Sequence, residues 1–98
     1  MKITQNKNGN TLTIAVEGRI DTATSKEFEE KSKADLNGVE SLILDFSALN
    51  YISSAGLRVL LSLQKIMNKQ GSMKITGAND IVKDIFEVTG FSEILDVE

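Results

Sequence analysis

The feature that constrains the fold most is a hairpin signal followed by a strict alternation of apolar residues. Asn8-Gly9 is the strongest short hairpin signal, because both central positions of a type I′ turn need a positive φ angle. The segment Thr11–Glu17 then places three apolar side chains on one face, namely Leu12, Ile14 and Val16. This alternation predicts a strand with one buried face, and Met1–Asn6 is expected to be its edge partner.

Strand and helix patterns alternate through the rest of the chain. Gly18–Asp21 is expected to leave the sheet and to lead into a charged helix over Ala23–Leu36. Ser41–Phe46 is an apolar run between polar ends, which is typical of a strand covered on both faces. The other expected elements are a helix from Ser53 or Ser54 to about Lys69, a strand over Met73–Thr76 and a helix from Asn79 or Asp80 to about Thr89. This last helix has apolar residues at spacings of one and four, namely Ile81, Val82, Ile85 and Phe86, and Phe91, Ile94 and Leu95 are expected to close the core.

Such an alternation implies parallel crossover connections, with helices packed on a sheet. The opening hairpin adds an antiparallel pair, so the sheet is expected to be mixed. We therefore predict an α/β (α+β) fold with four or five strands in a mixed sheet and about four helices packed on it. A chain of 98 residues forms one domain, here residues 1–98.

Two residue types are missing from the chain, and their absence narrows the possible chemistry. Without cysteine there are no disulfides, no thiolate metal ligands and no cysteine nucleophile. Without histidine the commonest general base and a common metal ligand are missing too. The remaining acid–base candidates are carboxylates such as Asp21 and Asp45, for which capping and turn roles are the better interpretation. We expect no enzyme activity, no metal and no cofactor.

Charge and hydropathy limit the kinds of partner that the chain is expected to bind. The net charge is −3, from 14 acidic and 11 basic residues, and the basic residues form no cluster. Only Arg19 and Arg58 are arginines. Nucleic-acid binding requires a basic surface, so none is expected. The chain has no apolar stretch of about 18 residues and no apolar leader, which predicts a cytoplasmic protein without membrane insertion.

The most informative segment is Asp45–Leu61, where a polar stretch follows a buried strand and two serines stand at the start of a helix. Backbone N–H groups at a helix start are unpaired, and the helix dipole is positive there. A phosphate on Ser53 or Ser54 would lie in this favourable field and add about −2 charges to a small exposed patch. Gly56 permits a close backbone approach in the first turn. The alternative interpretation is an ordinary helix cap and a glycine that relieves packing.

The same segment resembles the signature of the STAS domain, the fold of bacterial anti-sigma factor antagonists. The family pattern there is Asp-Ser-Ser/Thr/Ala-Gly-Leu, after a strand ending in Asp or Asn and a loop with an aromatic residue. Ser53 stands at the family's Asp, Ser54 stands at its phosphorylated serine, and Ala55-Gly56-Leu57 follow in register. The flanking residues that also fit are Asp45, Tyr51, the Gly18–Asp21 turn and the ending Ile81–Leu95.

The resemblance implies a partner-switching function. The unphosphorylated protein would bind an anti-sigma factor that is also a serine protein kinase, and so displace the sigma factor. The kinase would phosphorylate Ser54 and end the binding, and a separate serine phosphatase would reset the protein. The implied binding patch covers Asn50–Ser54, Gly56–Arg58 and Arg19–Thr24, and its principal residues are Asp21, Ser53, Ser54, Gly56 and Arg58. Arg58 is either a contact to a partner carboxylate or an ordinary solvated arginine.

The resemblance leaves two questions open. Ser53 replaces the family's frequent Asp, so a kinase that recognises this carboxylate would lose a contact. The family also includes stand-alone subunits of lipid-transport ABC ATPases and components of stress-signalling assemblies, which is the alternative function. The identity of the bound protein, a kinase or an ABC ATPase, discriminates between the two.

Overall fold

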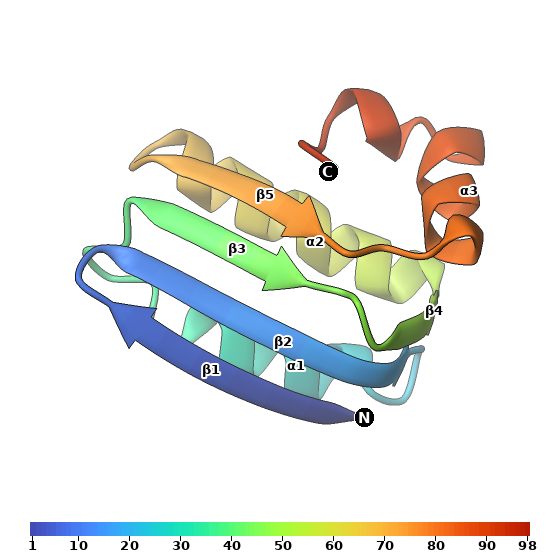
Figure 1. The fold of residues 1–98 in the computed structure, drawn as a ribbon, viewed down its shortest axis with the longest axis horizontal. Helices are drawn as coiled ribbons and strands as arrows, with labels where there is room; N and C mark the ends of the chain where they lie inside the picture. Colours follow the sequence, from blue (N-terminus) through green and yellow to red (C-terminus); the bar gives the residue numbers. More distant parts are fainter.

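The computed structural model describes all residues, 1–98, as a five-stranded sheet with helices packed against it (Figure 1). The elements are β1 (Lys2–Asn8), β2 (Thr11–Ile20), α1 (Ser25–Lys33), β3 (Ser41–Asp45), β4 (Leu49–Ile52), α2 (Ser54–Asn68), β5 (Ser72–Thr76) and α3 (Asp80–Val88). A short 3-10 turn, Phe91–Glu93, follows α3. The predicted α/β class and mixed sheet are confirmed, although there are three α-helices where about four were expected.

The N-terminal hairpin forms where the sequence predicts it, but its turn is of another type. β1 pairs antiparallel with β2 from Lys2↔Glu17 to Asn8↔Thr11, so the two turn residues are Gly9 and Asn10. Gly9 has a φ of 61°, and no residue other than glycine has a positive φ. A positive φ at the first central residue alone is the mark of a type II′ turn. The expected type I′ turn, with Asn8 at a central position, was therefore wrong.

The helices cover only one face of the sheet. The strand order is β1-β2-β3-β5, in which β2, β3 and β5 are parallel. The two crossovers through α1 and α2 both step in the same direction along the sheet, and nearly all such crossovers are right-handed. Both helices therefore lie behind the sheet in Figure 1. The prediction that Ser41–Phe46 is covered on both faces was wrong, since Leu42 and Leu44 are buried whereas Ile43 is half-buried.

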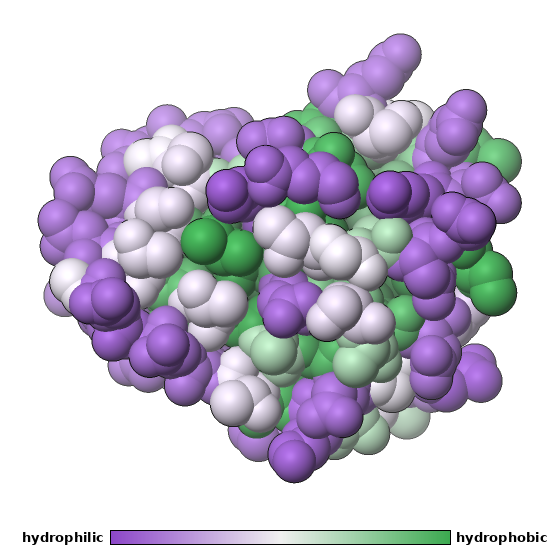
Figure 2. Space-filling model, viewed as in Figure 1, coloured by the Kyte–Doolittle hydropathy of each residue, from purple (hydrophilic) through white to green (hydrophobic).

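The other face of the sheet is open to solvent. Its half-buried positions on the central strands are Thr11, Thr13, Ala15, Ser41, Ile43 and Asp45. Figure 2 shows this side, with many weakly polar side chains across its middle, among a few hydrophobic and hydrophilic ones, and mostly hydrophilic side chains around its rim. Short hydroxyl-bearing side chains pack against their cross-strand neighbours and still meet water, so this face is stable without a second layer of helices.

β2 is longer than predicted, because it changes partner part-way along its length. Thr11–Ala15 pairs with β3, whereas Gly18–Ile20 pairs in parallel with β4 after a shift in register. Gly18 has a φ of 96°, and its N–H donates to the Ala48 carbonyl at 3.0 Å. Gly18–Ile20 therefore stays in the sheet, contrary to expectation, and the chain leaves the sheet only at Asp21. The polar stretch before Ser53 contains β4, a strand too short to show a recognisable alternation.

One core of 23 buried apolar residues lies between the sheet and the helices. The predicted inward positions Leu12, Ile14 and Val16 are all buried, which confirms the alternation. α3 buries Val82 and Phe86, whose i, i+4 spacing gives it a narrow apolar face. Ile81 lies outside that face and is 60% exposed. Ile94 is 50% exposed, so its assignment to the core was wrong.

α2 and α3 begin and end close to the predicted residues, whereas α1 differs from its prediction. α1 covers Ser25–Lys33 and is shorter at both ends than the expected Ala23–Leu36, although Phe28 and Leu36 are both buried. α3 is capped as predicted by Asn79, whose side chain accepts the Val82 N–H at 2.9 Å. None of the helices has the length and apolar character required to cross a membrane.

Two valines of α3 test the position of the core. Val82 is fully buried and Val88 is 84% exposed, so the same substitution on the same helix meets opposite environments. Val82→Ala should lower the free energy of unfolding by about 2 kcal/mol, from the lost burial of two methyl groups and the cavity left behind. Val88→Ala should change it by less than about 0.5 kcal/mol. Urea unfolding measures both, and equal effects would contradict the packing of α3.

Candidate functional site

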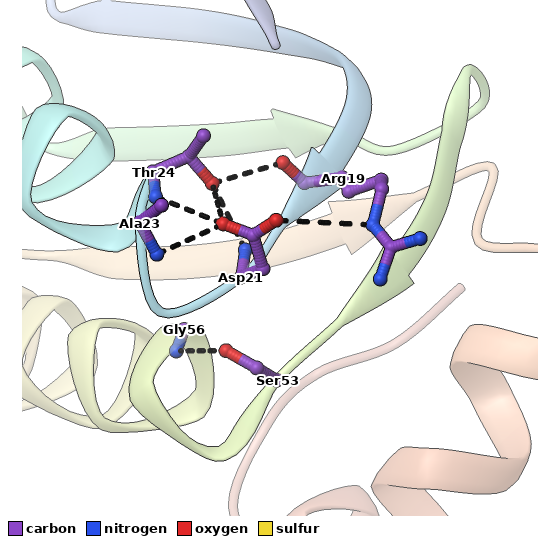
Figure 3. A network of polar contacts seen from close by, with 6 residues as sticks. All are labelled: Arg19, Asp21, Ala23, Thr24, Ser53 and Gly56. Carbon is purple, nitrogen blue, oxygen red and sulfur yellow. Dashed lines mark hydrogen bonds and ion pairs between the residues drawn. The ribbon is translucent and has the colours of Figure 1, made fainter.

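Two motifs that are far apart in the sequence meet where β2 and β4 end. The strands pair in parallel through Arg19↔Tyr51 and Ile20↔Ile52. The Ser53 N–H then donates to the Ile20 carbonyl at 2.8 Å, which continues the pairing beyond the last residue of β4. Asp21 follows Ile20 directly, so the start of the Asp21 turn and the start of α2 lie side by side (Figure 3). The structure thus brings together the two segments that the sequence analysis singled out.

The two adjacent serines have different environments. Ser53 is the N-cap of α2, with φ −89° and ψ 173°, and its hydroxyl oxygen accepts the Gly56 N–H at 3.3 Å. Ser53 is half-buried. Ser54 is the first residue of α2 and is exposed, and its hydroxyl makes no hydrogen bond. One hydroxyl is therefore occupied in capping the helix, and the other is free at the surface.

Asp21 holds the turn that enters α1. Its Oδ1 accepts the N–H groups of Ala23 and Thr24, each at 3.0 Å. Thr24 returns the interaction, because its Oγ1 accepts the Asp21 N–H at 2.9 Å. This reciprocal pair at spacing i, i+3 has the geometry of a capping box. The Asp-x-x-Thr spacing was visible in the sequence, but the role of Thr24 was not recognised there.

These hydrogen bonds lower the pKa of the Asp21 carboxyl below its ordinary value of 3.8. The Thr24 backbone N–H contributes most, followed by the Thr24 hydroxyl, because both donate to the ionised form. The Ala23 N–H and the charge of Arg19 act in the same direction. Asp21 is therefore a fixed negative charge at neutral pH.

Arg19 lies between an aromatic ring and this carboxylate. Its guanidinium carbon is 5.1 Å from the centroid of the Tyr51 ring, within the range of a cation–π contact. Its Nε is 3.8 Å from Asp21 Oδ2. Both contacts involve exposed side chains, so they orient Arg19 more than they stabilise the fold. Arg19 and Tyr51 face each other because β2 and β4 are in register, which the sequence analysis did not predict.

Gly56 allows α2 to pack tightly against the ends of both strands. A Cβ atom at this position would lie 2.7 Å from Ile20 Cγ2 and 2.7 Å from Ile52 Cγ1. Both isoleucines are fully buried and have no room to move away. The predicted close approach at Gly56 is therefore present, and it is made to β2 and β4.

Arg58 is exposed one turn into α2, between buried Leu57 and Val59, as the sequence predicts. It lines a shallow hollow of about 300 Å³ between α1 and α2, together with Ser25, Lys26, Glu29, Ala55 and Val59. The hollow opens beside the start of α2. All five predicted site residues thus lie in the region where β2, β4, α1 and α2 meet.

The two carboxylates considered as an acid–base pair are kept apart. Asp45 pairs with Ala15 of β2, whereas Asp21 follows Ile20 at the end of that strand. At about 3.3 Å per residue, roughly 20 Å of strand separates the two positions. Asp45 has a local role, because its Oδ1 accepts the Ser47 N–H at 3.0 Å. The carboxylates act separately, each in its own turn.

A comparison with known families identifies the domain. The family model described as the STAS domain matches residues 2–98. The chain belongs to the STAS domain family. It is 33% identical to BtrV, a proposed anti-sigma factor antagonist of Bordetella bronchiseptica, over 99% of this chain and 85% of that protein. It is 27% identical to the anti-sigma-B factor antagonist of Listeria monocytogenes, over 89% of this chain and 78% of that protein.

Solved structures show the same fold at lower sequence identity. The unphosphorylated anti-sigma factor antagonist SpoIIAA superposes on this STAS domain with a TM-score of 0.85 at 16% identity, covering 99% of this chain and 88% of that one. The phosphorylated form of the Bacillus protein SpoIIAA gives a TM-score of 0.74 at 17% identity, with 99% and 91% coverage. At these identities the likeness concerns the fold alone.

The lowered pKa of Asp21 predicts how the stability of this STAS domain depends on pH. A carboxylate with a lowered pKa in the folded state contributes stability above pH 3.8, and that contribution is lost as the pH falls through the folded pKa. Asp21→Asn should therefore be less stable than the wild type at pH 7, and the difference should shrink below pH 3.8. Urea midpoints measured from pH 7 to pH 2.5 test this. A difference that stays constant over this range would contradict the role of the charge.

The close contact at Gly56 predicts the effect of a single methyl group. Gly56→Ala gains up to about 1 kcal/mol of helix propensity but overpacks a filled site, which costs about 1–3 kcal/mol. The net effect should be a loss of roughly 1–2 kcal/mol in the free energy of unfolding. Urea unfolding measures it. A stabilised variant would show that α2 is not held against Ile20 and Ile52.

Proposed function

We propose that this STAS domain is an anti-sigma factor antagonist whose binding is switched off by phosphorylation of Ser54. The partner would be an anti-sigma factor that is also a serine protein kinase, and a separate phosphatase would restore the binding form. Two curated relatives carry antagonist names, and the fold is shared with SpoIIAA in both its phosphorylated and unphosphorylated forms. In this cycle the catalytic groups belong to the partners, and this domain supplies the switched surface.

The observation that carries the proposal is the difference between the two serines. A kinase needs a hydroxyl that it can reach, and Ser54 has one at the exposed start of α2. The Ser53 hydroxyl is half-buried and already accepts the Gly56 N–H. The same cap holds the helix start in place while Ser54 is modified. The difference supports Ser54 as the acceptor, which is also the serine selected by the family pattern.

The surroundings of Ser54 account for the loss of binding on phosphorylation. The charged residues near the helix start are exposed Arg19 and Arg58 and half-buried Asp21. A partner that matches these charges would also meet a dianion after phosphorylation. Desolvation of the phosphate and repulsion from partner carboxylates would then oppose association. The fold itself need not change, because Ser54 is at the surface.

Ser53 is the one departure from the family pattern, because it stands where the pattern has an Asp. An Asp at an N-cap accepts backbone N–H groups as a serine does, so Ser53 preserves the geometry of the cap. It does not supply the negative charge beside Ser54. Recognition of this domain by its kinase would therefore rely on neighbouring groups such as Asp21, which lies across the β2–β4 pairing.

Substitutions at the two serines test the switch. Ser54→Asp should weaken binding to the partner at least tenfold, which is about 1.4 kcal/mol or more, through the charge at the centre of the patch. Ser54→Ala should bind as the wild type does and should not be phosphorylated. Ser53→Ala is the matched control: it should lose about 0.5–2 kcal/mol of stability with its cap and still be phosphorylated at Ser54. Binding is measured by calorimetry, and the site is mapped by mass spectrometry after incubation with kinase and ATP.

The identity of the captured protein separates the proposal from its alternative. Immobilised Ser54→Ala protein should retain a kinase-type anti-sigma factor from a lysate, and Ser54→Asp protein should not. Retention of an ABC transport ATPase by both variants would contradict the proposal and favour a structural subunit. Phosphate on Ser53 alone would contradict the assignment of the serine.

A further inference from the structure

Arg58 is placed to reach a group attached to Ser54. The two residues are four positions apart on α2, so they are neighbours on the same face of the helix, with Cβ atoms about 5–6 Å apart. A helical side chain leans towards the N-terminus and covers the turn before its own Cα. The Arg58 side chain is therefore long enough, and suitably directed, to reach the turn that begins with Ser54. Both side chains are exposed, so nothing in the core holds either one in place.

A second cation, Lys26 of α1, lies across a hollow from Arg58. Lys26 lines the hollow between α1 and α2 together with Arg58 and Ala55, the residue that follows Ser54. The one carboxylate in the lining, that of Glu29, is already paired with Lys33 at 2.8 Å. Neither Lys26 nor Arg58 takes part in any ion pair of the structure. Two unpaired cations therefore share a hollow that is also lined by Ala55, the residue after exposed Ser54.

We propose that a phosphoryl group on Ser54 is bound within the same molecule by Arg58, with Lys26 as a second contact across the hollow. The proposal rests on the proposed function in one respect, namely that Ser54 is the residue that becomes phosphorylated. A guanidinium donates two parallel hydrogen bonds to phosphate oxygens, and a lysine ammonium adds a point charge. Phosphorylation then acts twice, because it adds a dianion and also withdraws Arg58 from the binding patch.

The withdrawal from the binding patch concerns Arg58 and not Arg19, the other arginine. Arg19 contacts Tyr51 of β4 and Asp21, the residue after β2, so its position does not depend on Ser54. Arg58 has no such contacts in the unphosphorylated protein and is free to pair with a partner carboxylate. Once it pairs with the phosphate, that contact to the partner is lost. An intramolecular pair forms without the entropy loss of association, so it competes effectively with the partner.

The test uses protein that carries phosphoserine at position 54 by incorporation during expression, so no kinase or partner is required. The second pKa of the phosphate, ordinarily about 6, is measured by phosphorus NMR titration. In the wild-type sequence it should be lowered by about half a unit or more, because Arg58 and Lys26 favour the dianion. Arg58→Gln should raise this pKa most of the way back to its ordinary value, and Lys26→Gln should raise it by a smaller amount. Lys65→Gln is the matched control, since Lys65 is an exposed cation seven residues further along the same helix.

A second measurement observes the arginine directly. The chain contains only two arginines, so nitrogen-15 spectra hold two Nε–H signals, and Arg19 provides an internal reference. The Arg58 signal should shift on phosphorylation and exchange more slowly with water, while the Arg19 signal stays where it is.

The outcomes separate this inference from the proposed function. Equal phosphate pKa values with Arg58 and with Arg58→Gln, or an Arg58 signal unchanged by phosphorylation, would overturn the intramolecular pair even if the pull-down retains a kinase. A lowered pKa that depends on Arg58 would establish the pair even if no kinase is retained. An equal loss of the shift in Lys65→Gln would also overturn it, because the effect would then come from general charge.

Discussion

The site depends on a single stretch of parallel pairing, that between the end of β2 and β4. The stretch covers only three or four residues of each strand, and it ends with the Ser53 N–H donating to the Ile20 carbonyl at 2.8 Å. This pairing positions the groups of the site. Asp21 and its turn follow one strand, Ser53 and α2 follow the other, and Arg19 meets Tyr51 across the pairing. A slip of one residue would reverse which side chains face outward and would separate Arg19 from the ring.

Two glycines make this pairing possible, for different reasons. Gly18 adopts a φ of 96° at the bulge where β2 leaves β3 and joins β4, a conformation that a side chain would strain. Gly56 has ordinary helical geometry, but a Cβ atom at this position would not fit between α2 and the buried isoleucines. Gly18 allows β2 to change its pairing partner, and Gly56 allows α2 to pack closely against the ends of β2 and β4. Together they bring an exposed helix start beside an exposed turn on an otherwise well-packed domain.

The charges around Ser54 differ in how firmly they are held. Asp21 is fixed by reciprocal hydrogen bonds with Thr24 and stays ionised at neutral pH, and Arg19 is oriented by Tyr51. Arg58 and Lys26 have no partner in the unphosphorylated protein. A surface built in this way presents a constant part, which suits recognition, and a variable part, which responds to a new charge. Under the proposed function, such a division would let a modification of Ser54 change binding without a change of fold.

The sequence by itself determined the features that depend on a few neighbouring residues. The alternation of Leu12, Ile14 and Val16 assigned the buried face of β2, and the Asn-Gly signal located the hairpin. Two polar pairs, Ser53-Ser54 and Asn79-Asp80, marked the starts of two helices to within one residue. The signature around Ser54 assigned the family, because it is a contiguous run of residue types. Such patterns can be seen in one segment alone, because they reflect its local backbone geometry and the burial of one of its faces.

Only the tertiary structure decided how these segments meet. β4 was missed because four residues carry too little periodicity, and the strand exists through its pairing with the distant end of β2. The single covered face of the sheet follows from strand order, which no local pattern specifies. The different environments of Ser53 and Ser54 are set by where α2 packs, and the nearness of Lys26 to Arg58 comes from the contact between two helices. In each case the deciding interaction joins residues far apart in the chain, so it becomes visible only once the chain is folded.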